Sequence, residues 1–116
     1  MPEADQPETN SSAASGPEVT RNDEQGRYEI REGEDLLGFA EFKPIGGGAV
    51  LLPHTEVFEG REGEGLGSRL ARFALDDIRA QGKQVVPMCP FIARYIADHR
   101  EYVELIHPQQ RGVFGL

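Results

Sequence analysis

The segment Glu62-Gly63-Glu64-Gly65-Leu66-Gly67-Ser68 lies between an extended stretch and a long amphipathic pattern, and it decides how the rest of the chain is interpreted. Its three glycines give backbone N–H groups room to converge on an anion, and the dipole of a following helix favours negative charge there. The glycines could also serve only to make a tight connection between a closely packed strand and helix. The segment therefore predicts a strand-to-helix turn, with phosphate binding and close packing as its two interpretations.

Two common phosphate-binding motifs do not fit this turn. A P-loop ends in Gly-Lys-Ser or Gly-Lys-Thr, but Gly67 is followed directly by Ser68 with no lysine between them. A dinucleotide-binding fold needs parallel strands from the start and an acidic residue at the end of the next strand, and here that strand ends in Cys89. Phosphate binding at this turn would therefore require another fold.

Strand-like patterns precede the turn. They cover residues 28–31, 36–42 and 49–57. Gly33-Glu34-Asp35 and Gly46-Gly47-Gly48 connect these segments and are short enough for an antiparallel meander. Pro53 has no backbone donor, so we expect the third strand to be bulged or unpaired there.

Helical patterns dominate the chain after the turn. A first apolar face at helical spacing is formed by Leu66, Leu70, Phe73, Ala74 and Ile78. Gly82 stands just beyond it, where a left-handed cap is common. A buried strand from Gln84 to Cys89 follows, and we expect it to pair in parallel through a right-handed crossover because a helix separates it from the meander. Pro90 then opens a second helix, whose apolar stripe is formed by Phe91, Ile92, Tyr95, Ile96 and His99.

The chain of 116 residues predicts one domain with extensions at both ends. Residues 1–25 hold hardly any large apolar side chains, so burial cannot offset the entropy of ordering them, and we expect a disordered N-terminal tail. Residues 26–107 form the predicted domain, which is of the α+β class with layered helices and strands. Residues 108–116 are a C-terminal extension.

Charge and composition exclude several functions. A net charge of −8, from 20 acidic and 12 basic side chains, repels nucleic acid and anionic membranes and favours a cationic substrate. One cysteine cannot form an internal disulfide, and the start Met1-Pro2-Glu3-Ala4-Asp5 lacks the features of a secretion signal, so we expect a cytoplasmic protein. No apolar stretch approaches the ~20 residues that a membrane span needs. The histidines are scattered, and no metal site is predicted.

Three short motifs in order carry a family resemblance. They are His54-Thr55-Glu56-Val57, Gly65-Leu66-Gly67-Ser68 and Cys89-Pro90-Phe91. From about Tyr28 to Ile106 the chain resembles the short GCN5-related N-acetyltransferase-like proteins, a group of minimal acetyltransferase domains. The resemblance implies an antiparallel meander of about three strands, a helix, a parallel strand and a helix, with the sheet splayed at a slot for acetyl-CoA or coenzyme A.

The resemblance also implies where the cofactor binds. The end of the third strand would hydrogen-bond the pantetheine arm, and the glycine turn would hold the pyrophosphate. The implied cofactor-binding residues are Thr55, Val57, Gly63, Glu64, Gly65, Leu66, Gly67, Ser68 and Arg69. Glu62 departs from the family pattern, which has Gln or Arg there. Arg69 and Arg72 could offset that acid or form a solvated helix face.

Catalysis by acetyl transfer needs an unprotonated amine, and therefore a base or a desolvating pocket. His54 and Glu56, two residues apart, project from one face of a regular strand and are the candidate bases. By resemblance, Tyr95 matches a tyrosine that can protonate the leaving thiolate, although a tyrosine in an apolar stripe can also be a core residue. Cys89, at a strand-to-helix junction where a helix dipole can activate a thiol, is either an active-site residue or a small buried hydrophobe.

These features predict an acetyl-CoA-dependent N-acetyltransferase acting on an amine of a small molecule or a protein. The alternative is a non-catalytic acyl-CoA-binding or protein-interaction module on the same fold. Glu62 motivates that alternative, as does the absence of the early helices that help to build the acceptor site in larger acetyltransferases. Here only Gly33-Glu34-Asp35 separates the first two predicted strands.

Overall fold

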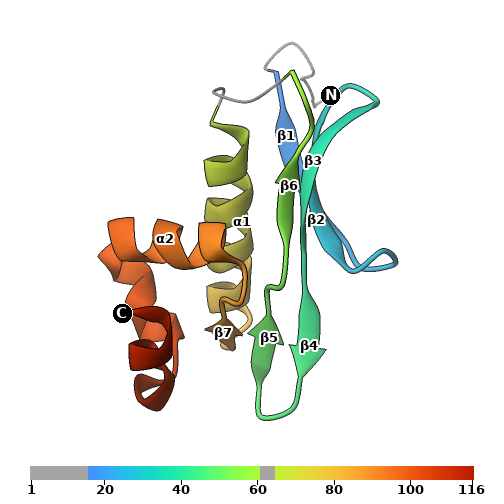
Figure 1. Cartoon of the computed structure of the whole chain (residues 1–116). Coiled ribbons are helices and arrows are strands. Elements are labelled where there is room, and N and C mark those ends of the chain that lie inside the picture. The colour runs from blue at the N-terminus through green and yellow to red at the C-terminus, as the bar shows by residue number, and fades with distance from the viewer. Residues whose placement is uncertain (1–15, 61–64) are drawn as a thin grey trace, which may run out of the picture.

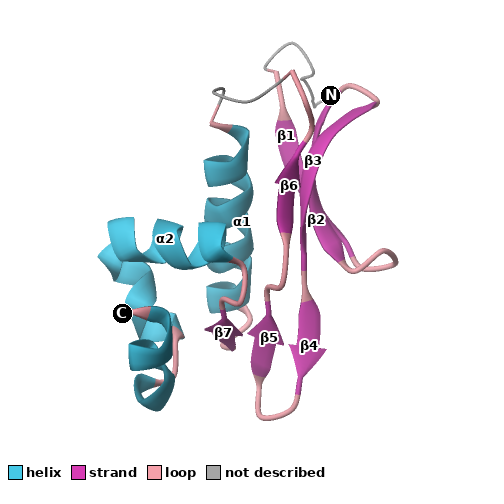
Figure 2. Cartoon of the chain, viewed as in Figure 1, coloured by secondary structure: helices cyan, strands magenta, loops and turns pink. Residues whose placement is uncertain are grey.

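A layer of strands carries all the helices of the described chain on one of its faces (Figures 1 and 2). The computed structural model describes residues 16–60 and 65–116. Its elements in chain order are β1 (Glu18–Asn22), β2 (Arg27–Glu32), β3 (Asp35–Glu41), β4 (Lys43–Ile45), β5 (Ala49–Leu51), β6 (Thr55–Val57), α1 (Leu66–Ala80), β7 (Gln84–Val86), α2 (Pro90–Asp98) and the 3₁₀ segments η3 (Arg100–Leu105) and η4 (Pro108–Phe114).

The strands form two sheets that are continuous along the chain, because β3 leads directly into β4 and β5 leads into β6. One sheet has the order β1-β2-β3-β6 and is antiparallel throughout. The other has the order β4-β5-β7, in which β4 and β5 are antiparallel and β5 and β7 are parallel. The predicted meander and parallel crossover are confirmed, because a helix separates β6 from β7 while short turns join the earlier strands.

The predicted irregularity at Pro53 is confirmed and is a β-bulge. Lys43 pairs with Leu51, while the Glu41 amide donates to the His54 carbonyl (2.8 Å). One residue of the β3–β4 strand therefore faces two residues of the β5–β6 strand. A proline is tolerated there because no ladder partner needs its missing N–H. The bulge divides the third predicted strand into β5 and β6.

The core lies between α1 and the strands. The buried face of α1 consists of Leu66, Leu70, Ala71, Ala74, Leu75 and Ile78. The sequence pattern assigned Phe73 to this face and missed Leu75, but Phe73 is 38% exposed and Leu75 is fully buried. Gly82 has a φ of 70° and its amide donates to the Arg79 carbonyl, which confirms the predicted left-handed helix end.

One predicted boundary, the end of the N-terminal tail, is wrong. The predicted disordered tail covers residues 1–25, but Glu18–Asn22 form β1, which pairs with residues 27–31 of β2. Residues 1–15 of that tail lie outside the described residues. Val19 packs against the core, and the remaining pairs are polar, so the segment has no strong apolar signal. The C-terminal extension also has structure: Pro108–Phe114 form a 3₁₀ segment that begins at a proline, and Phe114 packs against the core.

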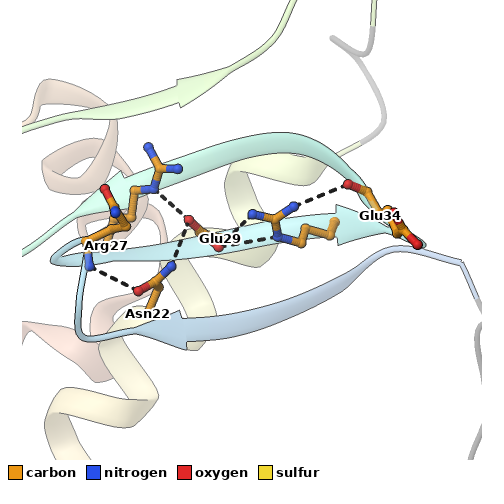
Figure 3. A network of polar contacts seen from close by, with 6 residues as sticks. Asn22, Arg27, Glu29 and Glu34 are labelled. Carbon is orange, nitrogen blue, oxygen red and sulfur yellow. Dashed lines mark hydrogen bonds and ion pairs between the residues drawn. The ribbon is translucent and has the colours of Figure 1, made fainter.

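A polar network covers the sheet face that carries no helix (Figure 3). Glu29, only 3% exposed, accepts hydrogen bonds from Arg27 (2.7 Å), Arg31 (3.1 Å) and Asn22 (3.3 Å). Burial alone would raise the pKa of Glu29, but these donors outweigh it and the pKa is lowered. Glu29 is therefore an ionised carboxylate that ties β2 to the end of β1.

None of the helices in residues 16–60 and 65–116 has the length and apolar character that a membrane crossing requires.

Gly38 is required by the close approach of β6 to β3. A Cβ added at this position would lie 2.5 Å from the Glu56 carbonyl oxygen. We predict that Gly38→Ala lowers the free energy of unfolding by about 1–3 kcal/mol, because backbone must move to relieve the overlap. Urea unfolding measures the change. Gly46→Ala is the control, since nothing lies within 4 Å of the added atom, and equal effects of the two substitutions would contradict the prediction.

Glu29→Gln is predicted to destabilise the sheet in a pH-dependent way. At neutral pH the substitution costs about 1–2 kcal/mol, because neutral hydrogen bonds replace charge-assisted ones. Since the folded pKa is lowered from 4.5, the wild-type advantage is present above that ordinary value and is lost as the pH falls through the folded one. Urea unfolding across this acid range tests it. Glu34→Gln is the control, because only the backbone carbonyl of Glu34 accepts from Arg31, and a pH-independent loss in Glu29→Gln would refute the prediction.

Candidate functional site

β6 presents one hydrogen-bonding edge that no other described strand covers. The order β1-β2-β3-β6 places it at the end of its sheet. The carbonyl of His54 is bonded to the Glu41 amide in β3. Antiparallel strands alternate in the edge to which successive residues turn their backbone groups, so Thr55 and Val57 direct their N–H and C=O groups away from β3. This edge can bind an extended ligand that carries amide groups.

The sheet splays where that edge begins. The Leu52 amide donates to the Val86 carbonyl, and the Cys89 amide donates to the Leu52 carbonyl, both at 3.0 Å. These bonds extend the parallel pairing of β5 and β7 as far as Leu52. The chain then passes through the bulge and pairs with β3 instead, so the described structure places β6 and β7 in different sheets. The predicted splay is thus present.

The N-terminus of α1 supplies free backbone donors. Gly65 has a left-handed φ of 74° and is the N-cap, and the first intrahelical bond runs from the Arg69 amide to its carbonyl at 3.1 Å. The amides of Leu66, Gly67 and Ser68 precede that bond. Within the described residues, which begin again at Gly65, no acidic side chain lies in the first turn of α1 and no side chain caps it. The predicted residues Gly63 and Glu64, and Glu62 beside them, lie outside the described residues.

Thr55 carries an unsatisfied polar group at the splay. Its Oγ1 is buried and has no hydrogen-bond partner in the described part of the chain. A buried hydroxyl without a partner is unfavourable, so a ligand group at this point would be stabilised by it. The unpaired hydroxyl has no signal in the sequence, although the family resemblance does place Thr55 in the implied cofactor-binding strand.

His54 and Glu56 form the pair that their spacing predicted. The His54 Nε2 and Glu56 Oε1 atoms are 3.2 Å apart, and the two side chains are 53% and 49% exposed. Their neighbour Val57 packs against the core, so alternation along the strand places the pair on the opposite, helix-free face. A proton acceptor therefore lies on β6 and is open to solvent.

Cys89 lies at the point of the splay but is inside the core. It is the N-cap of α2, it is 4% exposed, and its carbonyl accepts from the Ala93 amide at 3.0 Å. Its thiol belongs to the buried apolar cluster. The structure thus brings Cys89 next to Leu52 at the end of the β5–β7 pairing, and its role in catalysis stays a prediction.

Tyr95 lies among the helices. Its ring stacks on His99, with centroids 4.0 Å apart, and lies near Tyr102. Burial raises the pKa of Tyr95. The positive charge of Arg72 lowers this pKa, and the negative charges of Asp76 and Glu101 raise it further. These neighbours belong to α1 and η3, and the structure shows no contact between Tyr95 and the His54–Glu56 pair.

Two further side chains flank the N-terminus of α1. Arg69, an implied cofactor-binding residue, donates from its guanidinium to the Pro17 carbonyl at 2.6 Å, ahead of β1. Phe91 packs its ring against Gly67, where an added Cβ would lie 2.9 Å from the ring. Gly67 thus lets the Phe91 ring of α2 lie close to the backbone of α1, whereas the predicted role of the glycines in helix–sheet packing stays a prediction. The contacts of Arg69 and Phe91 could not be found from the sequence because they join distant segments.

Comparison with known proteins assigns this architecture. The sequence profile described as GCN5-related N-acetyl-transferase matches residues 27–105, more than half of the chain. The chain belongs to the GCN5-related N-acetyltransferase family. The match contains β2 to α2, the splay and the N-terminus of α1. It supports an acetyltransferase on this fold, and it confirms the resemblance carried by the three short motifs.

A solved structure shows the same fold. The acetyltransferase domain is similar to an NMR structure of a protein described as a GCN5-like N-acetyltransferase from Staphylococcus aureus, with a TM-score of 0.61 at 15% identity over 78% of this chain and 87% of that chain. A crystal structure from Desulfovibrio desulfuricans, described as an acetyltransferase of the GNAT family, gives a TM-score of 0.47 at 23% identity over 67% of this chain and 51% of that chain. No curated protein matches the sequence.

Proposed function

We propose that the chain is an acetyl-CoA-dependent N-acetyltransferase that acetylates a primary amine. The observation that supports this most directly is the uncovered edge of β6, which begins at the splay and is followed in the chain by the N-terminus of α1. That arrangement offers amide-bonding groups and then anion-binding groups in the order in which coenzyme A carries its pantetheine amides and its phosphates. Membership of the family is in accord with this proposal.

The residues present fit such a cofactor. Thr55 and Val57 would hold the pantetheine amides through their outward backbone groups, and the buried Thr55 hydroxyl would gain the partner that it lacks. The amides of Leu66, Gly67 and Ser68 would hold the phosphates. When bound, acetyl-CoA supplies an activated acetyl group as a thioester.

The chemistry required of the protein is proton removal. An alkylamine with an ordinary pKa of about 10.4 is protonated at neutral pH and is not nucleophilic. The His54–Glu56 pair would accept that proton, and the nitrogen would lose its second proton to solvent as the acetyl group of the bound thioester passes to it and the coenzyme A sulfur leaves as a thiolate. Direct transfer fits the 4% exposure of Cys89, because a thiol in the core is poorly placed for an incoming amine. The departing thiolate needs a proton, and Tyr95, whose phenol is protonated at neutral pH like that of an ordinary tyrosine, is the proposed donor.

Coenzyme A binding is the first test, and Ser68→Glu is its variant. A carboxylate in the first turn of α1 should stabilise the helix by about 0.5 kcal/mol. It should also weaken coenzyme A binding about tenfold by repelling the phosphates. Ser68→Ala is the control and should change affinity little. Thermal unfolding and isothermal titration measure the two opposed effects.

Amide chemical shifts during the same titration locate the ligand. Thr55, Val57 and Leu66 to Ser68 should shift, whereas silence at these amides would overturn the proposal. Binding without any acetyl transfer would favour the non-catalytic acyl-CoA-binding module instead.

Loss of the base should affect turnover and not binding. We predict that His54→Gln and Glu56→Gln each lower kcat about 100-fold with a blocked lysine peptide as acceptor, because general-base assistance is lost. Coenzyme A affinity should stay within about twofold of the wild-type value, since the proposed contacts with the cofactor are backbone groups of other residues. Release of free thiol measures the rate. Glu59→Gln is the matched control just beyond β6, and full activity in both test variants would remove the pair from the mechanism.

A further inference from the structure

The helix-free face of β1-β2-β3-β6, called the open face below, carries the catalytic pair. In Figure 3 the Glu29 network lies on the near side of the strands and the helices lie behind them. His54 and Glu56 project on this same side, as the burial of Val57 on the other side requires. An acceptor amine that reaches the pair must therefore approach across the open face.

We propose that the open face is the docking surface for a basic, lysine-containing segment of a protein acceptor. This inference rests on the proposed function and names the class of its substrate. The proposed acceptor is a polypeptide because the aromatic and charged side chains of the open face extend along three strands and beyond the catalytic pair. They cover more surface than a small amine can contact.

An aromatic platform lies beside the pair. Phe39 is the cross-strand partner of Glu56. Its ring centroid is 6.0 Å from those of His54 and Phe58, and the Arg27 guanidinium lies 4.8 Å from it on β2. Lysine and arginine side chains pack their alkyl stems on such surfaces and keep their charged ends in solvent. Because the Arg27 guanidinium already lies over the Phe39 ring, the residues that flank the reacting lysine would pack on the rings of His54 and Phe58 beside it.

The charge of the open face favours a cationic partner. The charged side chains that the strand register places there are Glu18, Arg27, Glu29, Arg31, Glu41 and Glu56. Four carboxylates against two guanidinium groups leave an excess of negative charge. Both arginines are already bound to Glu29, so Glu41 and Glu56 are the acids that face the platform.

An acidic hollow continues the surface beyond Glu41. It has a volume of about 350 Å³ and is lined by, among others, Asp23, Glu24, Glu41 and Lys43. Arg21 binds Asp23 at 2.6 Å, and the charge of Lys43 offsets one of the two remaining acids, so Glu24 and Glu41 leave the hollow with one net negative charge for a guest cation. A second basic side chain of the docked segment fits there, while its lysine lies at the His54–Glu56 pair. The acceptor is therefore a segment with more than one positive charge.

A second copy of this chain is a poorer occupant. Each copy has a net charge of −8, so two copies repel each other. The lysines of the chain are Lys43 and Lys83 only, so a copy offers few acceptor amines. Charge complementarity thus selects a basic partner.

The test uses the full chain without coenzyme A and a blocked peptide of alternating lysine and glycine. We expect backbone amide shifts in β3 and β6, around Phe39 and Glu41, and none in α2. Glu41→Lys and Glu24→Lys should each weaken binding about fivefold or more, because each removes an attraction and adds a repulsion. Asp98→Lys makes the same charge change at the end of α2 and should weaken binding by less than about twofold.

Several results would overturn the inference. These are equal weakening by Asp98→Lys and Glu41→Lys, shifts confined to the helices, equally tight binding of a glutamate–glycine peptide, or no binding. Self-association that Glu41→Lys abolishes would make a second copy the occupant. Each of these leaves the proposed function standing if coenzyme A still shifts Thr55 and Ser68. Peptide binding at the open face without any coenzyme A binding would instead remove the cofactor proposal.

Discussion

The change of pairing partner at Pro53 is the constraint on which the rest of the structure depends. One continuous strand cannot pair fully with both β3 and β7 on its two edges and also leave an edge for a ligand. The chain resolves this with an extra residue opposite Phe42, where a proline has no N–H to lose. Before the bulge the strand joins β7, and after it the strand joins β3. The uncovered edge of β6, the outward direction of the His54–Glu56 pair and the position of Cys89 all follow from that change.

The position of α1 is fixed by aspartates on two of its sides. Asp77 accepts hydrogen bonds from Tyr28 (2.7 Å) and Arg21 (2.9 Å), which belong to the sheet. Asp76 accepts one from Tyr102 (2.7 Å) in η3, and burial together with that bond raises the pKa of Tyr102 to about 12. Charge-assisted bonds of this kind are stronger than neutral ones. Because they hold the helix between the sheet and the C-terminal segments, its N-terminal amides keep a fixed place beside the splay.

The sequence predicted those parts of the fold that have a local signal. Most of the α1 face follows from apolar spacing along a single helix. One residue type in one backbone setting predicts each of three other features, which are the Gly82 cap, the Pro90 helix start and the Pro53 bulge. β1 was missed because its stability comes from pairing with β2, and only Val19 carries an apolar signal. In the site, spacing of two residues was enough to place His54 and Glu56 together. The buried Thr55 hydroxyl and the Pro17–Arg69 contact depend on distant segments and had no sequence signal.

The small size of the domain explains why charged side chains cover the sheet face that carries no helix. The polar side chains of a sheet face without helices must find partners within that face. An apolar face in the same position would promote association with other sheets. Here Glu29 binds the two arginines beside it, and Arg27 in turn covers the ring of Phe39, so side chains of the strands replace the missing helical layer. Within this network of ion pairs, Glu29 stays charged although it is only 3% exposed. The carboxylates at the edge of this network remain exposed to water, where they can attract cations over several ångströms. The same use of side chains in place of helices that stabilises this small domain therefore leaves this face of its sheet accessible to solvent.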